Sequence, residues 1–475
     1  MVYESGDNRR LPPFAMAILS HLLLSLTSAD VFAGDHSRWW WLAVAATFLA
    51  IIAVTSLRRY ADDFITKLVR PKPLHEILHV HYEAAPHDPC SWVNLGREKF
   101  LLVRDKDLVA QVLSTDFPAF SKRTQMHDYL LGLFGQDGSE WRRARSSLTP
   151  SFTPAALRAA AAHVKAHARR LRDVAACAPC LTRRHLLAYC VDCIASSVFA
   201  LSAEALPTSQ APTTSPFLDA VAHIDQVKRS DGGRVVMELL GRSLFHALKL
   251  AQLPTSVTSF FSTVGQDSFS FRQHNKVSAH DFIKSLMKKM QQEQKTEDEI
   301  CEEVSEQTVA VLSAGSSDTC HVLRHCLAEL AALPDIQSQL RAQICAGNDA
   351  PPLLDEFIAE VLRLHPAEPV LIRECQSACK LGAELLQPGD NVIVPVWSLH
   401  RDIRLSLSDD ADLQQGHNFQ LGRKQAVQLH FSAGPRMCVG YRLGLLQVRT
   451  ALTELLSHFE LMESEFNVIH LRKIT

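Results

Sequence analysis

One stretch near the end of the chain has the residue types and spacing of an iron ligand. It reads FSAGPRMCVG, that is F-x-x-G-x-R-x-C-x-G. A thiolate at Cys438 would be a strong iron ligand, and it would push electron density toward a group bound on the far side of the metal. Gly434 and Gly440 permit close backbone contacts that a side chain would block. Arg436 would place a cation where a porphyrin carboxylate needs one, and Phe431 could shield the sulfur from water.

A simpler interpretation is that Cys438 is one of twelve cysteines and is merely buried, as free cysteines often are. Five matched positions within ten residues favour iron ligation instead. The stretch resembles the haem-binding loop of the cytochrome P-450 family. In this family the cysteine is the axial ligand of haem b, so the resemblance implies that role for Cys438.

Further strings resemble the same family and occur in the family's order. They are GSEWRRARSSLTPSF, VAVLSAGSSDTCHVL, EVLRLHPAEPVLIRE and LHRD. The resemblance covers roughly residues 75–475, and strings such as DFPAFSKR and GLLQVRTAL are most like the animal microsomal group that handles toxins and drugs. It implies one large domain, mainly α with a small β portion (α+β), in which haem lies between a long central helix and the cysteine loop.

Three more residues are candidate partners of the haem propionates. Trp141 and Arg145 are four residues apart, so they share one face of a helix, and an indole N–H beside a guanidinium suits a carboxylate. The resemblance implies the same role for Arg373. Arg142 and Arg143 point elsewhere on the helix and are interpreted as a solvated face that could help to dock an acidic electron donor.

Glu360 and Arg363 are three residues apart, which is close enough for an ion pair on a helix. The resemblance implies that this pair is structural and locks the segment that carries the cysteine. The family usually completes the network with a further arginine, and the string GHNF occupies its place here. Asn418 is therefore predicted to replace that arginine, and the network is expected to be weaker because an amide cannot neutralise Glu360.

The string VAVLSAGSSDTCHVL resembles the family's central helix, in which an acid and an alcohol relay protons to oxygen. Ala314 and Gly315 match the pattern A-G-x-D/E-T. Without a gap, Ser317 takes the place of the acid and Asp318 that of the alcohol, while Thr319 is rotated by about 100° from the expected direction. A one-residue π-bulge would instead restore an Asp318–Thr319 pair. A third interpretation is a polar patch in a buried helix.

Composition bounds the remaining possibilities. A net charge of -2 gives no reason to expect nucleic acid as a partner. Twelve irregularly spaced cysteines fit a reducing compartment better than a disulfide framework. Cys177, Cys180, Cys190 and Cys193 have the spacing C-x2-C-x9-C-x2-C of a possible zinc site, but residues 186–201 read as one apolar helix, so buried thiols are favoured.

The N-terminal part of the chain predicts a membrane anchor within residues 1–57. Residues 39–57 carry no charge and are long enough to cross a bilayer, and residues 11–28 form a second, weaker apolar segment. Arg58 and Arg59 follow the longer segment and predict that the rest of the chain lies on the cytosolic side. The resemblance implies that the membrane is that of the endoplasmic reticulum. A linker at 58–74 then leads to the haem domain at 75–475.

The remaining elements are read from local patterns. Short β runs are expected at 91–95, 99–103 and 391–396, and helices at 108–113 and 155–176. Residues 217–290 are predicted to hold further helices, broken near Pro254.

The resemblance implies a haem-thiolate monooxygenase that inserts one oxygen atom from O2 into an apolar small molecule. No strand–GxGxxG–helix unit for NADPH occurs, so electrons are expected from NADPH-cytochrome P-450 reductase, with cytochrome b5 as a second candidate donor. Two alternatives remain open. One is a P-450-like isomerase or dehydratase acting on peroxides, which needs no acid–alcohol pair. The other is a catalytically silent haem or ligand binder.

Replacing the cysteine tests the central assignment. We expect Cys438→Ala to abolish thiolate-ligated haem, because alanine offers the iron no sulfur. The absorption spectrum of the reduced protein under carbon monoxide reports that ligation directly. A variant that still shows the thiolate spectrum would contradict the assignment.

Overall fold

The computed structural model describes residues 72–95, 98–123, 132–178, 180–207, 215–229, 254–275, 281–347, 351–407, 416–462 and 468–474. The apolar segments at 11–28 and 39–57, and the linker at 58–74 up to residue 71, lie outside these residues. Among the helices that are described, none is both long and apolar enough to span a membrane. All of the described residues belong to one compact unit, Pro71–Thr475.

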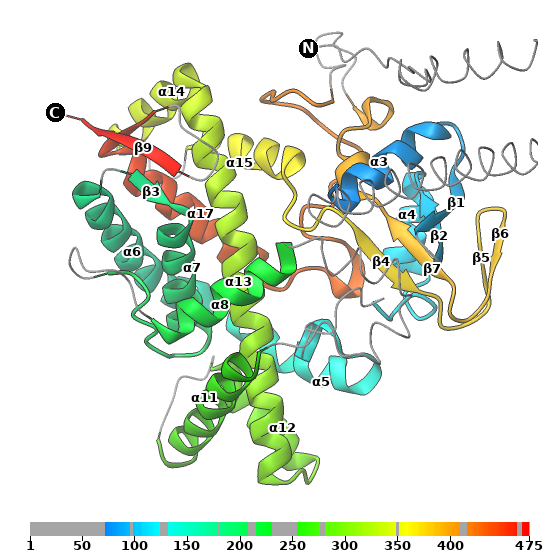
Figure 1. The fold of residues 1–475 in the computed structure, drawn as a ribbon, viewed down its shortest axis with the longest axis horizontal. Coiled ribbons are helices and arrows are strands. Elements are labelled where there is room, and N and C mark those ends of the chain that lie inside the picture. The colour runs from blue at the N-terminus through cyan, green and yellow to red at the C-terminus, as the bar shows by residue number, and fades with distance from the viewer. Residues whose placement is uncertain are drawn as a thin grey trace, which may run out of the picture. The chain divides into compact units, whose positions relative to one another are not determined.

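Most of this unit is helical, as the sequence predicted (Figure 1). The helices are α3 (Leu74–Ala84), α4 (Lys106–Ala110), α5 (Gly138–Leu148), α6 (Pro154–Cys177), α7 (Arg183–Val198), α8 (Pro216–Arg229), α11 (Thr255–His274), α12 (Phe282–Gln292), α13 (Glu297–Ala332), α14 (Pro334–Cys345), α15 (Pro352–Leu364), α16 (Val396–Leu399) and α17 (Tyr441–Leu456). Helix α13, with 36 residues, runs through the helical part, and α6, α7 and α17 gather at one side of it.

The β portion is small. Its main sheet has the order β1 (Cys90–Leu95), β2 (Glu98–Val103), β7 (Asn391–Val394), β4 (Leu371–Glu374). Only the β2–β7 pair is parallel, with Phe100 opposite Asn391. A second sheet has the order β3 (Cys180–Thr182), β9 (Val468–Lys473), β8 (Phe459–Met462), and β5 (Cys379–Leu381) pairs with β6 (Glu384–Leu386). Strand β7 is shorter than the predicted run 391–396, because Pro395 follows it and α16 begins at Val396.

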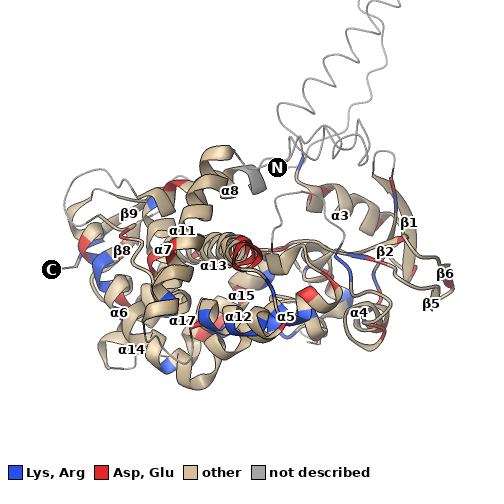
Figure 2. Cartoon of the chain, turned by 90° about the horizontal axis from the view of Figure 1, so that it is seen from below, with Lys and Arg blue, Asp and Glu red and all other residues tan. Residues whose placement is uncertain are grey.

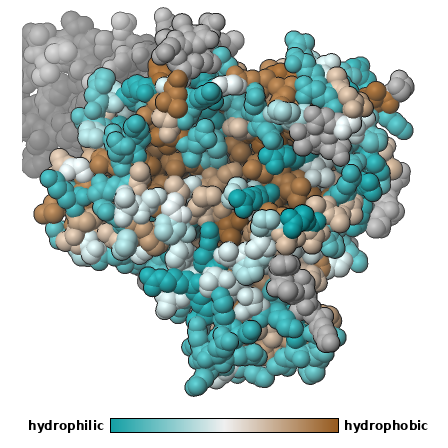
Figure 3. All heavy atoms as spheres, turned by 180° about the vertical axis from the view of Figure 1, so that it is seen from behind, coloured by the Kyte–Doolittle hydropathy of each residue, from teal (hydrophilic) through white to brown (hydrophobic). Residues whose placement is uncertain are grey.

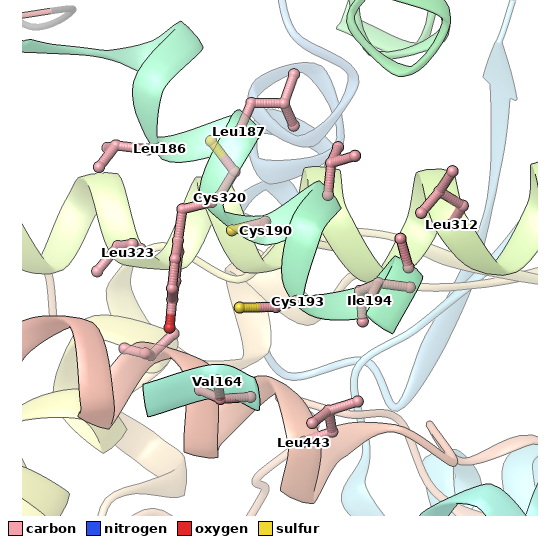
Figure 4. Packing of buried hydrophobic residues seen from close by; sticks show 14 of the residues in the cluster. Val164, Leu186, Leu187, Cys190, Cys193, Ile194, Leu312, Cys320, Leu323 and Leu443 are labelled. Atoms are coloured by element: carbon pink, nitrogen blue, oxygen red, sulfur yellow. The ribbon is translucent and has the colours of Figure 1, made fainter. Parts of the chain in front are cut away.

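Helix α13 has a well-defined start and a fully packed middle. Thr296 and Glu299 form a reciprocal capping box, and acidic residues fill the first turn, where the helix dipole favours them. Its largest packing partner is α7, whose middle is buried on all sides, as expected of a helix that is apolar all round. Figure 4 shows Cys190, Cys193 and Ile194 of α7 in this apolar layer, with Leu312 of α13 close by.

A buried ion-pair network joins α15 to the segment that leads to Cys438. Arg363 binds both carboxylate oxygens of Glu360, at 2.8 Å each. It also donates to the carbonyl oxygens of His400 at 2.9 Å and Gly416 at 2.6 Å. Both members of the pair are at most 4% exposed, so these bonds hold the segment without competition from water.

The expectation that this network lacks a further cation is wrong. Asn418 supplies its backbone carbonyl, which accepts from Arg363 at 3.0 Å. The further cation is Arg423, five residues later, whose side chain is fully buried with Nε 3.8 Å from Glu360 Oε1. The sequence did not reveal this cation, because Arg423 lies five residues beyond the position at which the family's pattern places an arginine. The main chain at Gln420 also donates to Glu360, at 2.8 Å.

One substitution tests the role of Arg423. Arg423→Leu removes a cation from a buried carboxylate and is expected to cost about 1–3 kcal/mol of stability. The midpoint of thermal unfolding, measured beside that of the unmodified protein, gives the comparison. If the variant unfolded at the same temperature as the unmodified protein, Arg423 would not be the network's further cation.

Candidate active site

The loop that carries Cys438 is held by its own backbone and by a close contact with a neighbouring segment. The main-chain N–H of Cys438 donates to the carbonyl oxygen of Phe431 at 2.9 Å. Gly434 has a φ of 68°, and a Cβ there would lie 1.8 Å from the carbonyl oxygen of Leu113. Only glycine fits this position. Phe431 packs near Tyr441, with ring centroids 5.6 Å apart, at the start of α17.

Cys438 is exposed in the structure. The surrounding protein still desolvates the sulfur enough to raise the pKa of the thiol, and the N–H of Gly440 opposes this by hydrogen bonding. The charge of Asp318 on α13 also raises that pKa, whereas Arg145 and Arg123 lower it. The thiol therefore lies within electrostatic reach of the central helix and of two arginines. A metal ion bound to sulfur would displace the proton outright.

Four arginines from separate segments lie in or near this loop, namely Arg123, Arg145, Arg373 and Arg436. The pKa of Arg373 is lowered to about 9, mainly by burial and further by the charges of Arg123 and Arg436. The pKa of Arg436 is lowered to about 10, mainly by burial and further by the charges of Arg123 and Arg145. Arg373 and Arg436 are each 3% exposed. Like charges buried this closely require anions between them.

The contacts of Arg436 show which of its donors are already used. Its Nη2 donates to the carbonyl oxygen of Gln136 at 2.8 Å and to the carboxylate of Asp137 at 2.7 Å. Its guanidinium lies 4.6 Å from the ring centroid of the buried Trp141. Its Nε and Nη1 are buried and have no hydrogen-bond partner within the described part of the chain. Unmet donors of this kind fit the carboxylates of a haem.

Arg123 belongs to this cluster and was missed as a site residue in the sequence. Its Nη2 donates to the carbonyl oxygen of Arg436 at 3.3 Å, and its guanidinium lies 5.5 Å from the ring centroid of Phe134. The preceding residue, Lys122, bridges to Glu374 at the end of β4. No spacing in the sequence points to Arg123, because only this pairing with β4 brings it beside Arg373.

The polar residues of the central helix face different neighbours. Ala314 and Asp318 are one turn apart and partly exposed, and Asp318 is the one whose charge reaches Cys438. Ser317 is 1% exposed, and its hydroxyl has no hydrogen-bond partner in the described structure. Gly315 packs against α7, since a Cβ there would lie 2.8 Å from Ile194 Cδ1.

Thr319 points toward α17. A Cβ placed on Gly444 of α17 would lie 3.5 Å from its Oγ1. Helix α13 is a regular α-helix throughout Glu297–Ala332, so the π-bulge considered for this stretch does not occur. Of the two residues, Thr319 faces α17, and Asp318 is the one whose charge acts on Cys438.

The four cysteines with zinc-like spacing are distributed over different environments. Cys190 and Cys193 are buried in α7, whereas Cys177 is exposed and Cys180 is half-buried in β3. Nowhere in the described ranges do three or more His, Cys, Asp or Glu side chains gather in a way that could hold a metal ion.

The two arginines that follow Trp141 differ in their exposure to solvent. Arg142 is exposed. Arg143 is only 11% exposed and lies 2.7 Å from Glu293 and 3.9 Å from Glu303. Its charge is therefore directed to neighbouring helices rather than to solvent.

Comparison with known proteins is consistent with this geometry. Residues 67–472 match the family described as Cytochrome P-450. The chain is 27% identical to probable cytochrome P-450 6a13 of Drosophila melanogaster, over 79% of this chain and 80% of the relative. It is 26% identical to cytochrome P-450 6k1 of Blattella germanica, over 84% and 83%. It is 26% identical to human cytochrome P-450 3A5, over 77% of each chain. The likeness to animal members of the family that the sequence predicted is thus confirmed.

These matches agree with the accessible cysteine, the ring of arginines around it and the long helix that faces it. The chain belongs to the cytochrome P-450 family and is a haem-thiolate monooxygenase that acts on a small molecule with electrons from a partner reductase.

Proposed function

We propose that Cys438 is the axial ligand of haem b and that Arg123, Arg145, Arg373 and Arg436 hold its propionates, with Trp141 supporting Arg436. The accessible Cys438 thiol within a cluster of buried guanidinium groups is the observation that carries this proposal. Bound haem supplies the chemistry of oxygen activation. The protein's own contribution is to orient the cofactor through charge-assisted hydrogen bonds and to hold the sulfur in its loop.

Asp318 is proposed as the residue that delivers protons on the oxygen side. Its carboxyl group takes the place of the family's alcohol in the ungapped reading, and its charge influences Cys438 from α13. The buried hydroxyl of Ser317 takes the place of the acid and supports Asp318 as a neighbour. Thr319 faces Gly444 and contributes to helix packing. Because a carboxyl group both accepts and donates a proton, one residue can do the work of the usual pair.

The electron donor is proposed to be NADPH-cytochrome P-450 reductase, with cytochrome b5 as an additional donor. Lys and Arg residues are concentrated along α5 and α12 (Figure 2). Arg142 of α5 and Lys284 and Lys288 of α12 are exposed. Helix α5 also carries Trp141 and Arg145, so this basic surface is connected to the haem site by a single helix. An acidic partner would be attracted to it.

The substrate is proposed to be an apolar small molecule of the kind handled by the animal microsomal group, at the membrane of the endoplasmic reticulum. On one face of the molecule, apolar side chains line a hollow between polar ones (Figure 3). A ligand entering such a surface gains affinity by burying its own apolar area. The uncharged segment at 39–57 supports membrane attachment, with the haem domain on the cytosolic side because of Arg58 and Arg59.

The assignment on α13 can be tested with two near-isosteric substitutions. Asp318→Asn is expected to keep the thiolate haem spectrum and to lower product formation by about 10–100-fold, because the amide cannot deliver a proton. Thr319→Val is expected to stay within about threefold of the unmodified protein, because its hydroxyl faces α17. Reductase-supported turnover, with product and hydrogen peroxide both measured against NADPH consumed, gives the comparison.

The opposite order of effects would identify Thr319 as the relay and contradict the ungapped assignment. A hydroperoxide converted by the protein without NADPH and reductase, in the absence of reductase-dependent oxidation, would instead favour an isomerase.

A further inference from the structure

A buried glutamine on the central helix is bonded to the segment that precedes α5. Gln307 of α13 has no exposed surface. Its Oε1 accepts from the main-chain N–H of Leu133 at 3.0 Å, and its Nε2 donates to Gln136 Oε1 at 3.0 Å. Nε2 also donates to Glu303 on the same helix at 2.9 Å. Both ends of this amide therefore bind, and two of the three bonds cross from α13 to the segment at 132–137.

Gln136 continues the connection in two directions. Its side-chain Nε2 donates to both carboxylate oxygens of Glu303, at 2.8 and 3.0 Å. Its backbone carbonyl accepts from Arg436 Nη2 at 2.8 Å, and the next residue, Asp137, accepts from the same nitrogen at 2.7 Å. The two acceptors that hold Arg436 thus lie on a segment that Gln307 and Glu303 hold in turn.

The segment packs tightly against Gln307. A Cβ on Gly132 would lie 2.9 Å from the Gln307 side-chain amide carbon. Within the segment, the main-chain N–H groups of Gly135 and Gln136 both donate to the carbonyl oxygen of Gly132. A short turn fixed in this way has little freedom to shift when its anchor is intact.

We propose that Gln307 and Gln136 are positioning residues for the haem site. They fix the acceptors of Arg436 Nη2 and so direct the remaining donors, Nε and Nη1, toward a haem carboxylate. This inference rests on the proposed role of Arg436. It connects the oxygen-side helix α13 to the cysteine loop through side-chain amides that touch neither haem nor substrate, and it makes haem retention depend on a residue of α13 that is remote in sequence from the cysteine.

The chain offers a matched control in Gln337 of α14. This glutamine is also buried, at 2% exposure, and it too joins two elements by its side-chain amide. It donates to the carbonyl oxygens of Leu330 and Leu461 and accepts from the N–H of Leu461. Its Oε1 also accepts from Arg341 Nη2 at 2.7 Å, and within the described part of the chain it bonds to none of the arginines of the haem site. Replacing it should perturb stability in a comparable way without affecting Arg436.

The experiment measures the rate at which the full-length holoprotein loses haem to an excess of a scavenging apoglobin. We expect Gln307→Leu and Gln136→Ala each to accelerate haem loss by about tenfold, since each removes anchors of a charge-assisted hydrogen bond. Gln136→Ala removes only a half-buried side chain and keeps the carbonyl that Arg436 uses, so it remains informative if Gln307→Leu folds poorly. Gln337→Leu is expected to lower the unfolding temperature but to leave haem loss within about twofold.

A double substitution separates positioning from general loosening. Gln136→Ala should add no further acceleration in an Arg436→Leu background, because the residue that it positions is already gone. Additive acceleration, an equal effect of Gln337→Leu, or wild-type haem loss in both glutamine variants would overturn the inference. If Arg436→Leu itself retains haem normally, the proposed propionate role of Arg436 fails instead.

Discussion

The structure around Cys438 depends on buried positive charge that the carboxylates of the described residues offset only in part. Arg373 and Arg436 are almost fully buried, and the pKa of each is lowered by desolvation and by neighbouring guanidinium groups. Asp137 offsets part of this charge at 2.7 Å from Arg436. Buried cations of one sign are costly unless an anion accompanies them. Under the proposed assignment, the two carboxylates of haem would supply these anions, and cofactor binding would then stabilise this region.

This arrangement requires precise support from the segments that carry the arginines. Arg373 lies on β4, which pairs with β7, and the bridge between Lys122 and Glu374 brings Arg123 alongside. The segment that leads to the cysteine loop is held by Glu360, Arg363 and Arg423. Because both sets of contacts are buried, a small shift of either segment would misplace several charges together.

The presence of Arg423 also bears on the alternative functions. A missing cation in the Glu360 network would be consistent with a catalytically silent protein. That cation is present and fully buried. The oxygen side remains unusual, because Asp318 occupies the place of an alcohol on an unbroken helix. This departure concerns proton delivery rather than haem binding, and family membership favours oxygen chemistry over an isomerase.

The sequence alone determined the cysteine loop, the Glu360–Arg363 pair and the helical character of the domain. Each depends on residues close together in the chain, where spacing on a turn or helix dictates which side chains meet. Tertiary structure decided the rest. Arg123 joins Arg373 only through strand pairing, and Arg423 reaches Glu360 only because the chain folds back. Only the structure showed that α13 is unbroken, which removes the one-residue bulge that would have paired Asp318 with Thr319. Contacts between distant segments leave no spacing to read, because loop length and packing, not local geometry, bring them together.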